Sequence, residues 1–140
     1  MENKSLNFET GIVTFSVNGA CEVSFNPTDS AFVEKLFNAF DTLDQRQERY
    51  KAEVDKVADK REIFAIAQKQ DAEMREIIDG VFGPVSDAIF GDMNVYAMAN
   101  GLPVWCNFLL AVMDEVDTTF AAQQKLTNPR IAKYTSKYHK

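Results

Sequence analysis

Residues 28–57 read TDSAFVEKLFNAFDTLDQRQERYKAEVDKV and contain neither glycine nor proline. Within this stretch a seam of mostly apolar side chains recurs at alternating steps of three and four residues, at Val33, Leu36, Phe40, Leu43, Gln47, Tyr50, Val54 and Val57. That spacing is typical of a coiled coil or of a helical hairpin. Pro27 precedes the stretch, and either Thr28 or Asp29 can cap a helix. The sequence therefore predicts a long helix that begins next to these residues.

A second apolar stripe follows Val57, out of register with the first. It consists of Ile63, Ile66, Ala67, Gln70, Met74, Ile77, Ile78 and Val81. A single straight helix from Thr28 to Phe82 would be roughly 80 Å long, which is long for a domain of this size. We therefore expect residues 28–82 to form a hairpin of two antiparallel helices, with the turn between Val57 and Arg61.

Residues 1–26 are predicted to form a β-ribbon. The segment 13–17 alternates apolar and hydroxyl side chains, which is the period of a half-buried strand. Asn18-Gly19 is a strong signal for a hairpin turn, because both residues tolerate a positive φ. The returning strand would bury Cys21, Val23 and Phe25, and residues 6–8 are a candidate third strand. An uncovered strand edge can recruit a partner.

The C-terminal part of the chain is predicted to contain short helical pieces followed by a long helix, over residues 84–124. Glycine and proline close the second hairpin helix at Gly83-Pro84, and Pro103 suits the first turn of the last helix. The fold class is thus α+β and mainly α, with one domain at 1–127. Residues 128–140 carry four basic side chains and no acid, and they are predicted to be a flexible tail.

Composition and residue patterns disfavour several function classes. The chain has 140 residues and a net charge of −6, which argues against nucleic-acid binding over the whole surface. No apolar run is long enough to span a membrane. The only histidine, His139, is next to the last residue, and Cys21 and Cys106 lie far apart without a partner motif. We therefore expect no catalytic residue, no metal and no cofactor, and the cysteines suit a reducing cytoplasm.

Aromatic side chains are the candidate partner-binding residues. Eleven phenylalanines are more than a slim helical domain readily buries, so we expect some of them in an exposed patch. The region between Phe82 and Leu110, with its short helices and frequent turns, is the favoured place. In the tail, tyrosines alternate with lysines, a pattern that suits either a docking peptide or stacking on nucleic acid. The candidate residues are Phe82, Phe90, Trp105, Phe108, Tyr134 and Tyr138.

Several strings of residues carry a resemblance to a known class of proteins. They are NPTD at 26–29 with FVEKLF at 32–37, DAEMR at 71–75 continuing to FG at 82–83, IFGD at 89–92 with GLPVW at 101–105, and IAKYT at 131–135. Together these strings resemble proteins encoded in the tail modules of long-tailed bacteriophages and prophages of Gram-positive bacteria. The motifs are structural rather than catalytic.

The resemblance implies a tail assembly chaperone that acts in the cytoplasm of the bacterial host. Such a protein binds the long tape measure protein before the tail tube protein polymerises around it, and it is expected to form homo-oligomers. Two alternatives remain open. The first alternative to the chaperone is a structural component of the virion, such as a tail completion or connector protein. The second is an acidic inhibitor of a host enzyme.

Overall fold

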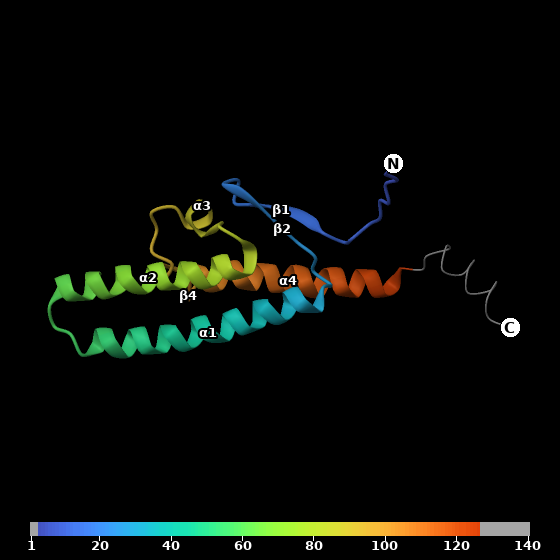
Figure 1. Ribbon diagram of the computed structural model, residues 1–140. Helices are drawn as coiled ribbons and strands as arrows, with labels where there is room; N and C mark the ends of the chain where they lie inside the picture. The colour runs from blue at the N-terminus through green and yellow to red at the C-terminus, as the bar shows by residue number, and fades with distance from the viewer. Residues whose placement is uncertain (1–2, 127–140) are drawn as a thin grey trace.

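The computed structural model describes residues 3–126, which adopt an α+β fold that is mainly helical (Figure 1). Two strands form an N-terminal hairpin, two long helices form a second hairpin, and a further long helix packs along that helical pair. In chain order the elements are β1 (Val13–Val17), β2 (Cys21–Phe25), α1 (Ser30–Asp55), α2 (Lys60–Phe82), α3 (Ser86–Phe90), β3 (Met98–Ala99), β4 (Leu102–Pro103) and α4 (Val104–Lys125). The predicted tail at 128–140 lies outside the described residues.

Helices α1 and α2 form the predicted antiparallel hairpin, with both N-termini capped by aspartate. The Asp29 side chain accepts a hydrogen bond from the amide of Ala31 at 3.0 Å, and Asp59 accepts one from the amide of Arg61 at 2.9 Å. Each cap satisfies an amide that the first helical turn leaves unpaired. The connection at 56–59 overlaps the turn expected between Val57 and Arg61, so the break in apolar register located it correctly.

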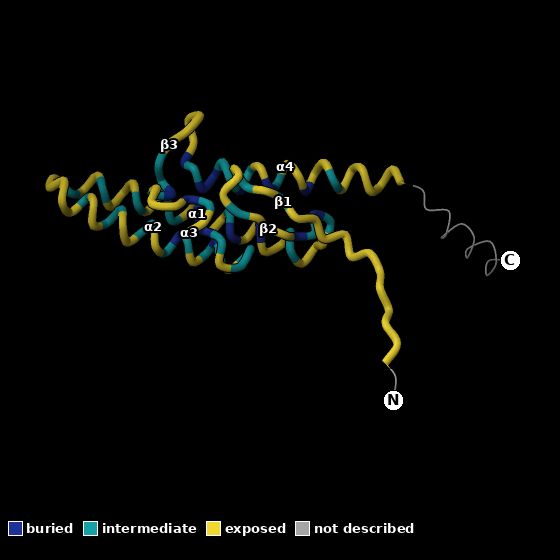
Figure 2. Tube along the Cα trace, turned by 90° about the horizontal axis from the view of Figure 1, so that it is seen from above, coloured by how far each residue is buried: buried dark blue, intermediate teal, exposed yellow. Residues whose placement is uncertain are grey.

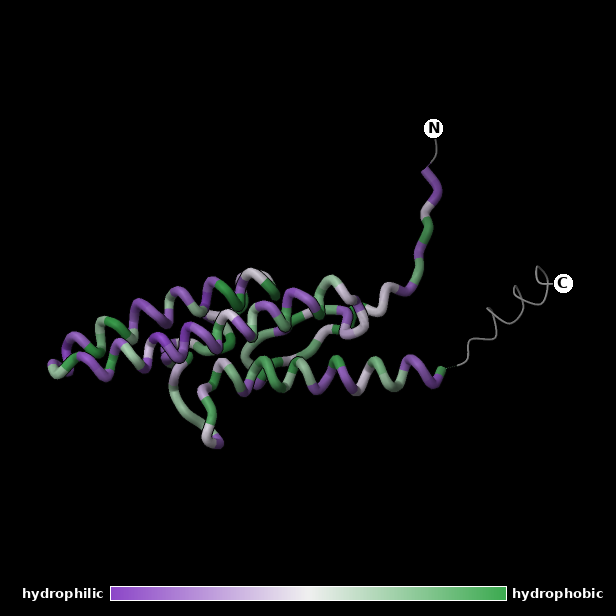
Figure 3. Tube along the Cα trace, turned by 90° about the horizontal axis from the view of Figure 1, so that it is seen from below, coloured by the Kyte–Doolittle hydropathy of each residue, from purple (hydrophilic) through white to green (hydrophobic). Residues whose placement is uncertain are grey.

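The core lies where α1, α2 and α4 run side by side. Its fully buried side chains include Leu36, Leu43, Met74, Ile78, Trp105 and Leu109. Burial does not extend to the ends of the helices (Figure 2). No residue between 44 and 73, around the turn of the helical hairpin, is buried, and the last buried residue of α4 is Val116. The helices alternate apolar and polar faces along their length (Figure 3). Within residues 3–126, no helix combines the length and the apolar character needed to cross a membrane.

Strands β1 and β2 pair antiparallel, from Val13 opposite Phe25 to Val17 opposite Cys21. The turn uses a positive φ at both Asn18 (50°) and Gly19 (70°), as the sequence predicts. Val23 and Phe25 are buried as expected, whereas Cys21 is only half-buried. The face that carries these residues packs on the helices, and its other face is open to solvent.

The predicted third strand at 6–8 is wrong. This segment has no strand structure, and Leu6 and Phe8 are 92% and 81% exposed. Gly11 turns the chain away from the ribbon with a φ of 81°. The side-chain amide of Asn26 fixes that turn by donating to the carbonyl oxygen of Thr10 at 2.7 Å. A Cβ at Gly11 would lie 2.8 Å from the same amide nitrogen, so the glycine is required for this close approach.

Candidate functional site

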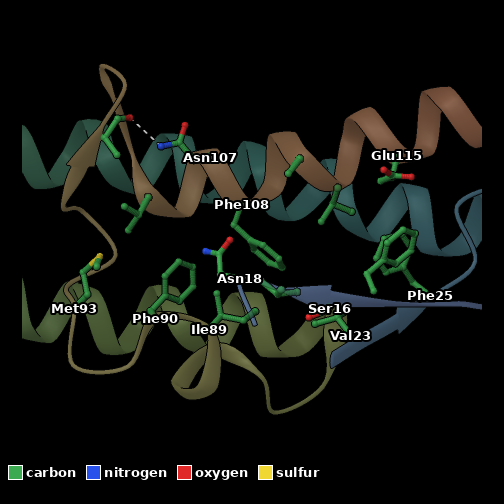
Figure 4. Close-up of a pocket in the computed structure, with 16 residues that line it drawn as sticks. Ser16, Asn18, Val23, Phe25, Ile89, Phe90, Met93, Asn107, Phe108 and Glu115 are labelled. Atoms are coloured by element: carbon green, nitrogen blue, oxygen red, sulfur yellow. Dashed lines mark hydrogen bonds between the residues drawn. The ribbon is translucent and has the colours of Figure 1, made fainter. Parts of the chain in front are cut away.

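An apolar groove between the ribbon and α4 is the best-formed candidate site (Figure 4). We call it the ribbon groove. Its walls come from β1, β2, α3 and α4, and its volume is about 500 Å³. Its principal apolar residues are Phe15, Val17, Ile89, Val104, Phe108 and Ala111. This size falls within the range of roughly 300–1,000 Å³ that is usual for binding sites.

The ribbon wall follows from the alternation of side chains along two paired strands. Phe15 and Val17 lie on one face of β1 because they are two residues apart. The ring of Phe15 stacks on that of Phe25 with centroids 4.8 Å apart, and Phe25 in turn stacks on Phe32 at the start of α1 at 4.7 Å. A continuous aromatic column therefore holds the ribbon against the helices. Because the ribbon has only two strands, it leaves part of α4 uncovered.

The α4 wall presents residues that repeat along one face of the helix. Val104, Phe108, Ala111 and Glu115 are spaced by four, three and four residues, which places them on the same side. They extend over about 16 Å of helix axis. Phe108 points into the groove and packs against Phe82 at 5.2 Å between ring centroids.

Polar groups in the ribbon groove are few. Among residues 3–126, Glu115 is the only charged residue that lines it, beside the neutral polar residues Ser16, Asn18 and Asn107. The Asn107 amide already donates to the carbonyl oxygen of Ala99 at 2.9 Å. Such a lining suits apolar side chains of a ligand.

A second, wider depression of about 730 Å³ lies beside α2 and the loop that precedes β3. Its most prominent charged group is Arg75, whose guanidinium is already engaged within the protein. It donates to the carboxylates of Asp71 at 3.0 Å and Asp87 at 2.9 Å, and to the carbonyl oxygens of Gly91 at 2.8 Å and Met93 at 2.7 Å. These bonds make Arg75 a structural cross-link rather than a group free to hold a ligand, so we prefer the ribbon groove.

The same depression contains the stacked rings of Tyr50 and Tyr96, with centroids 4.3 Å apart. Within residues 3–126, the Tyr96 hydroxyl is the one buried side-chain polar atom that lacks a hydrogen-bond partner. Burial away from water raises the pKa of Tyr96 to about 12, and the neighbouring Tyr50 contributes to this rise. An unpaired buried hydroxyl costs free energy that a phenylalanine would not.

We therefore expect Tyr96→Phe to leave the free energy of unfolding at pH 7 unchanged or to raise it by about 1 kcal/mol. In the unfolded chain tyrosine loses its proton near pH 10, whereas folded Tyr96 keeps its proton until about pH 12. The wild-type protein should thus lose stability as the pH rises between these values, and the variant should lose less. Urea denaturation at pH 7 and in alkaline buffer measures both effects. A loss above about 1 kcal/mol at pH 7 would show that the hydroxyl has a partner.

The predicted aromatic residues occupy different environments. Trp105 is 1% exposed and Phe90 is 8% exposed, so the expectation that these two belong to an exposed patch is wrong. Both side chains fill the space between helices, where their large apolar area is removed from water. Phe82 is half-buried in the aromatic cluster, and Phe108 is half-buried and lines the ribbon groove. Tyr134 and Tyr138 lie outside the described residues.

Sequence reasoning missed the ribbon's part in the site. Phe15 and Val17 were predicted as one face of a half-buried strand, without a role as a groove wall. A signal was present, because a two-stranded ribbon is too narrow to cover a long helix.

No protein-family profile, curated protein sequence or solved structure matches this chain.

Proposed function

We propose that this protein is a non-catalytic tail assembly chaperone of a long-tailed bacteriophage or prophage, and that it binds the tape measure protein through the ribbon groove. The observation that carries the proposal is the apolar, nearly uncharged groove beside α4. The resemblance of its sequence strings to phage tail-module proteins supplies the identity of the partner. In this proposal the protein acts in the cytoplasm of the bacterial host, as a homo-oligomer, with the tail tube protein as a possible second partner.

A helical partner suits the geometry of the groove. The groove follows α4 for about 16 Å, or three turns, and grooves of this kind receive side chains spaced by three, four and seven residues on an amphipathic helix. Phe15 of β1 and Phe108 of α4 both line the groove, so an inserted side chain would contact apolar surface from the ribbon and from the helix. The net charge of −6 would keep a complex with an apolar helix dispersed in solution.

A charge placed in this groove is expected to prevent partner binding. Ala111 is exposed on α4 and lines the groove, so Ala111→Glu should lower capture of the tape measure protein at least about tenfold, because burying an unpaired carboxylate is costly. Glutamate is compatible with an exposed helical position, and the fold should be retained. The measurement is affinity capture of tagged full-length protein from a lysate of the phage-producing host, quantified by mass spectrometry.

Ala121→Glu is the matched control, since Ala121 is also exposed on α4 but does not line the groove. It should leave capture unchanged. Equal capture by both variants would remove the groove from the proposal. Enrichment of a host nuclease or polymerase in place of the tape measure protein would favour the acidic inhibitor instead.

One feature favours a virion structural component as the second candidate function. Among residues 3–126 the strands β1 and β2 pair only with each other, so their outer edges carry unpaired backbone groups that can extend a neighbour's sheet. The exposed Leu6 and Phe8 next to this ribbon would add apolar contacts. Detection of the protein in purified phage particles distinguishes this function, because a chaperone leaves before the tail is complete.

A further inference from the structure

We propose that the ribbon groove is the docking site of this chain's own C-terminal segment, residues 127–140. This segment would occupy the groove until a partner displaces it. The inference does not depend on the identity of the partner, because it concerns one chain alone. Three observations carry it: the charges of the groove walls, the length of the segment, and the chemistry of its side chains.

The charges of the two parts are complementary. In the elements that form the groove walls, Lys125 is the only basic residue. The acidic residues of those elements are Glu22, Asp87, Asp114, Glu115 and Asp117. Among residues 3–126, Glu115 is the one that lines the groove. Asp87 is paired with Arg75, and no ion pair is found for the other four among residues 3–126. The segment carries Arg130, Lys133, Lys137 and Lys140 and no acid, so it supplies the opposite charge.

The segment is long enough to reach the groove. Helix α4 ends at Lys125, and Glu115 and Phe108 lie about 15 Å and 25 Å back along its axis. An extended chain advances about 3.3 Å per residue. If the segment turns back beside α4, Arg130 therefore reaches the level of the acidic residues near Glu115, about 13 Å beyond Leu126. Tyr134 reaches the level of Phe108, about 26 Å beyond Leu126.

In this alignment, Arg130 and Tyr134 would each meet groove residues of complementary chemistry. Arg130 would lie near Glu115, where a guanidinium can bind the carboxylate with two parallel hydrogen bonds. Tyr134 would place an aromatic ring in the apolar part of the groove, between Phe15 and Phe108, with its hydroxyl directed to solvent. The groove lies along the helix whose end delivers the segment, so no other element of the protein has to move.

The test is NMR of the methyl groups of Val104, Val112 and Ile89 in the full-length chain, all of which line the groove. The double variant Arg130→Glu/Tyr134→Ser is expected to shift these methyl signals, while signals of Leu36 and Leu43 in the core stay in place. Lys56→Glu is the control, because it reverses a charge at the exposed turn of the helical hairpin. It should leave the groove signals unchanged.

Two further measurements complete the test. A synthetic peptide of residues 127–140, added to the double variant, should move the groove signals back toward their wild-type positions. Diluting the wild-type protein about tenfold should leave them unchanged, because binding within one chain does not depend on concentration. Groove signals that are identical in wild type and double variant would overturn the proposal. Signals that change on dilution would overturn it in favour of exchange between two copies.

Discussion

Trp105→Ala should lower the free energy of unfolding by about 3–5 kcal/mol. The Trp105 side chain is 1% exposed, and its ring lies edge-on to Phe40 with centroids 5.5 Å apart. Its indole N–H also donates to the side-chain oxygen of Gln47 at 2.7 Å. Alanine would leave a cavity between α1 and α4. It would also leave the side-chain oxygen of Gln47 without its hydrogen-bond donor. Urea denaturation followed by circular dichroism measures the loss.

The matched control for this variant is Phe120→Ala on the same helix. Phe120 is 48% exposed, so its truncation should cost less than about 1 kcal/mol. Similar losses for the two variants would contradict the burial of Trp105. If Trp105→Ala kept its stability but no longer captured a partner, Trp105 would have to be assigned to an interface.

Arg75→Met is the second substitution with a large expected effect, a loss of about 3 kcal/mol. The Arg75 side chain is 13% exposed. Three of its hydrogen bonds link α2 to α3 and to the loop that follows α3, and a fourth pairs it with Asp71 on α2 itself. Methionine is similar in length but would also lose the contact of the guanidinium with the ring of Phe90, whose centroid lies 5.8 Å from the guanidinium carbon. It would leave Asp71, which is 18% exposed, without its charged partner. Removing one member of a partly desolvated pair is costly because the other charge stays partly buried without a partner.

A double variant separates the lost pair from the lost packing. Arg75→Met/Asp71→Asn should recover part of the loss, because the remaining charge is then removed. Asp71 also accepts a hydrogen bond from the amide of Val95 at 2.7 Å, which an asparagine can still accept. Arg49→Met, at an exposed position of α1, should change stability by less than about 0.5 kcal/mol. Equal stability of Arg75→Met and Arg49→Met would show that the cross-link is not needed.

The helices could be predicted from sequence because their signals are local. The steps of three and four residues from Val33 define the inner face of α1, and the break after Val57 marks the turn. A further signal at that turn was overlooked, since Asp59 followed by Glu62 has the pattern of an N-terminal capping box. The side chain of Asp59 does cap α2. These features depend on residues close in sequence, so they can be recognised without knowledge of the tertiary structure.

The site could be predicted only in part because it depends on contacts between distant segments. Helix α4 is apolar over more than one face, and its periodicity does not tell which face a neighbour covers. Trp105 is buried against α1, where its indole N–H donates to Gln47, 58 residues away in the sequence. Phe108 remains accessible because the ribbon covers α4 incompletely. The chain turns away from the ribbon at Gly11, next to the hydrogen bond from Asn26 to Thr10, and no hydrophobic pattern reveals this turn.

The uneven burial along the helical hairpin gives the molecule a gradient of local stability. At the root, Leu36, Leu43, Met74 and Ile78 tie α1 and α2 to the core, whereas residues 44–73 contribute no buried side chain. Backbone hydrogen bonds near the turn can therefore open while the root stays folded, at a fraction of the global free energy of unfolding. We therefore expect the turn end of the hairpin to open more readily than its root. This end can adjust its shape to a neighbouring molecule without disturbing the ribbon groove.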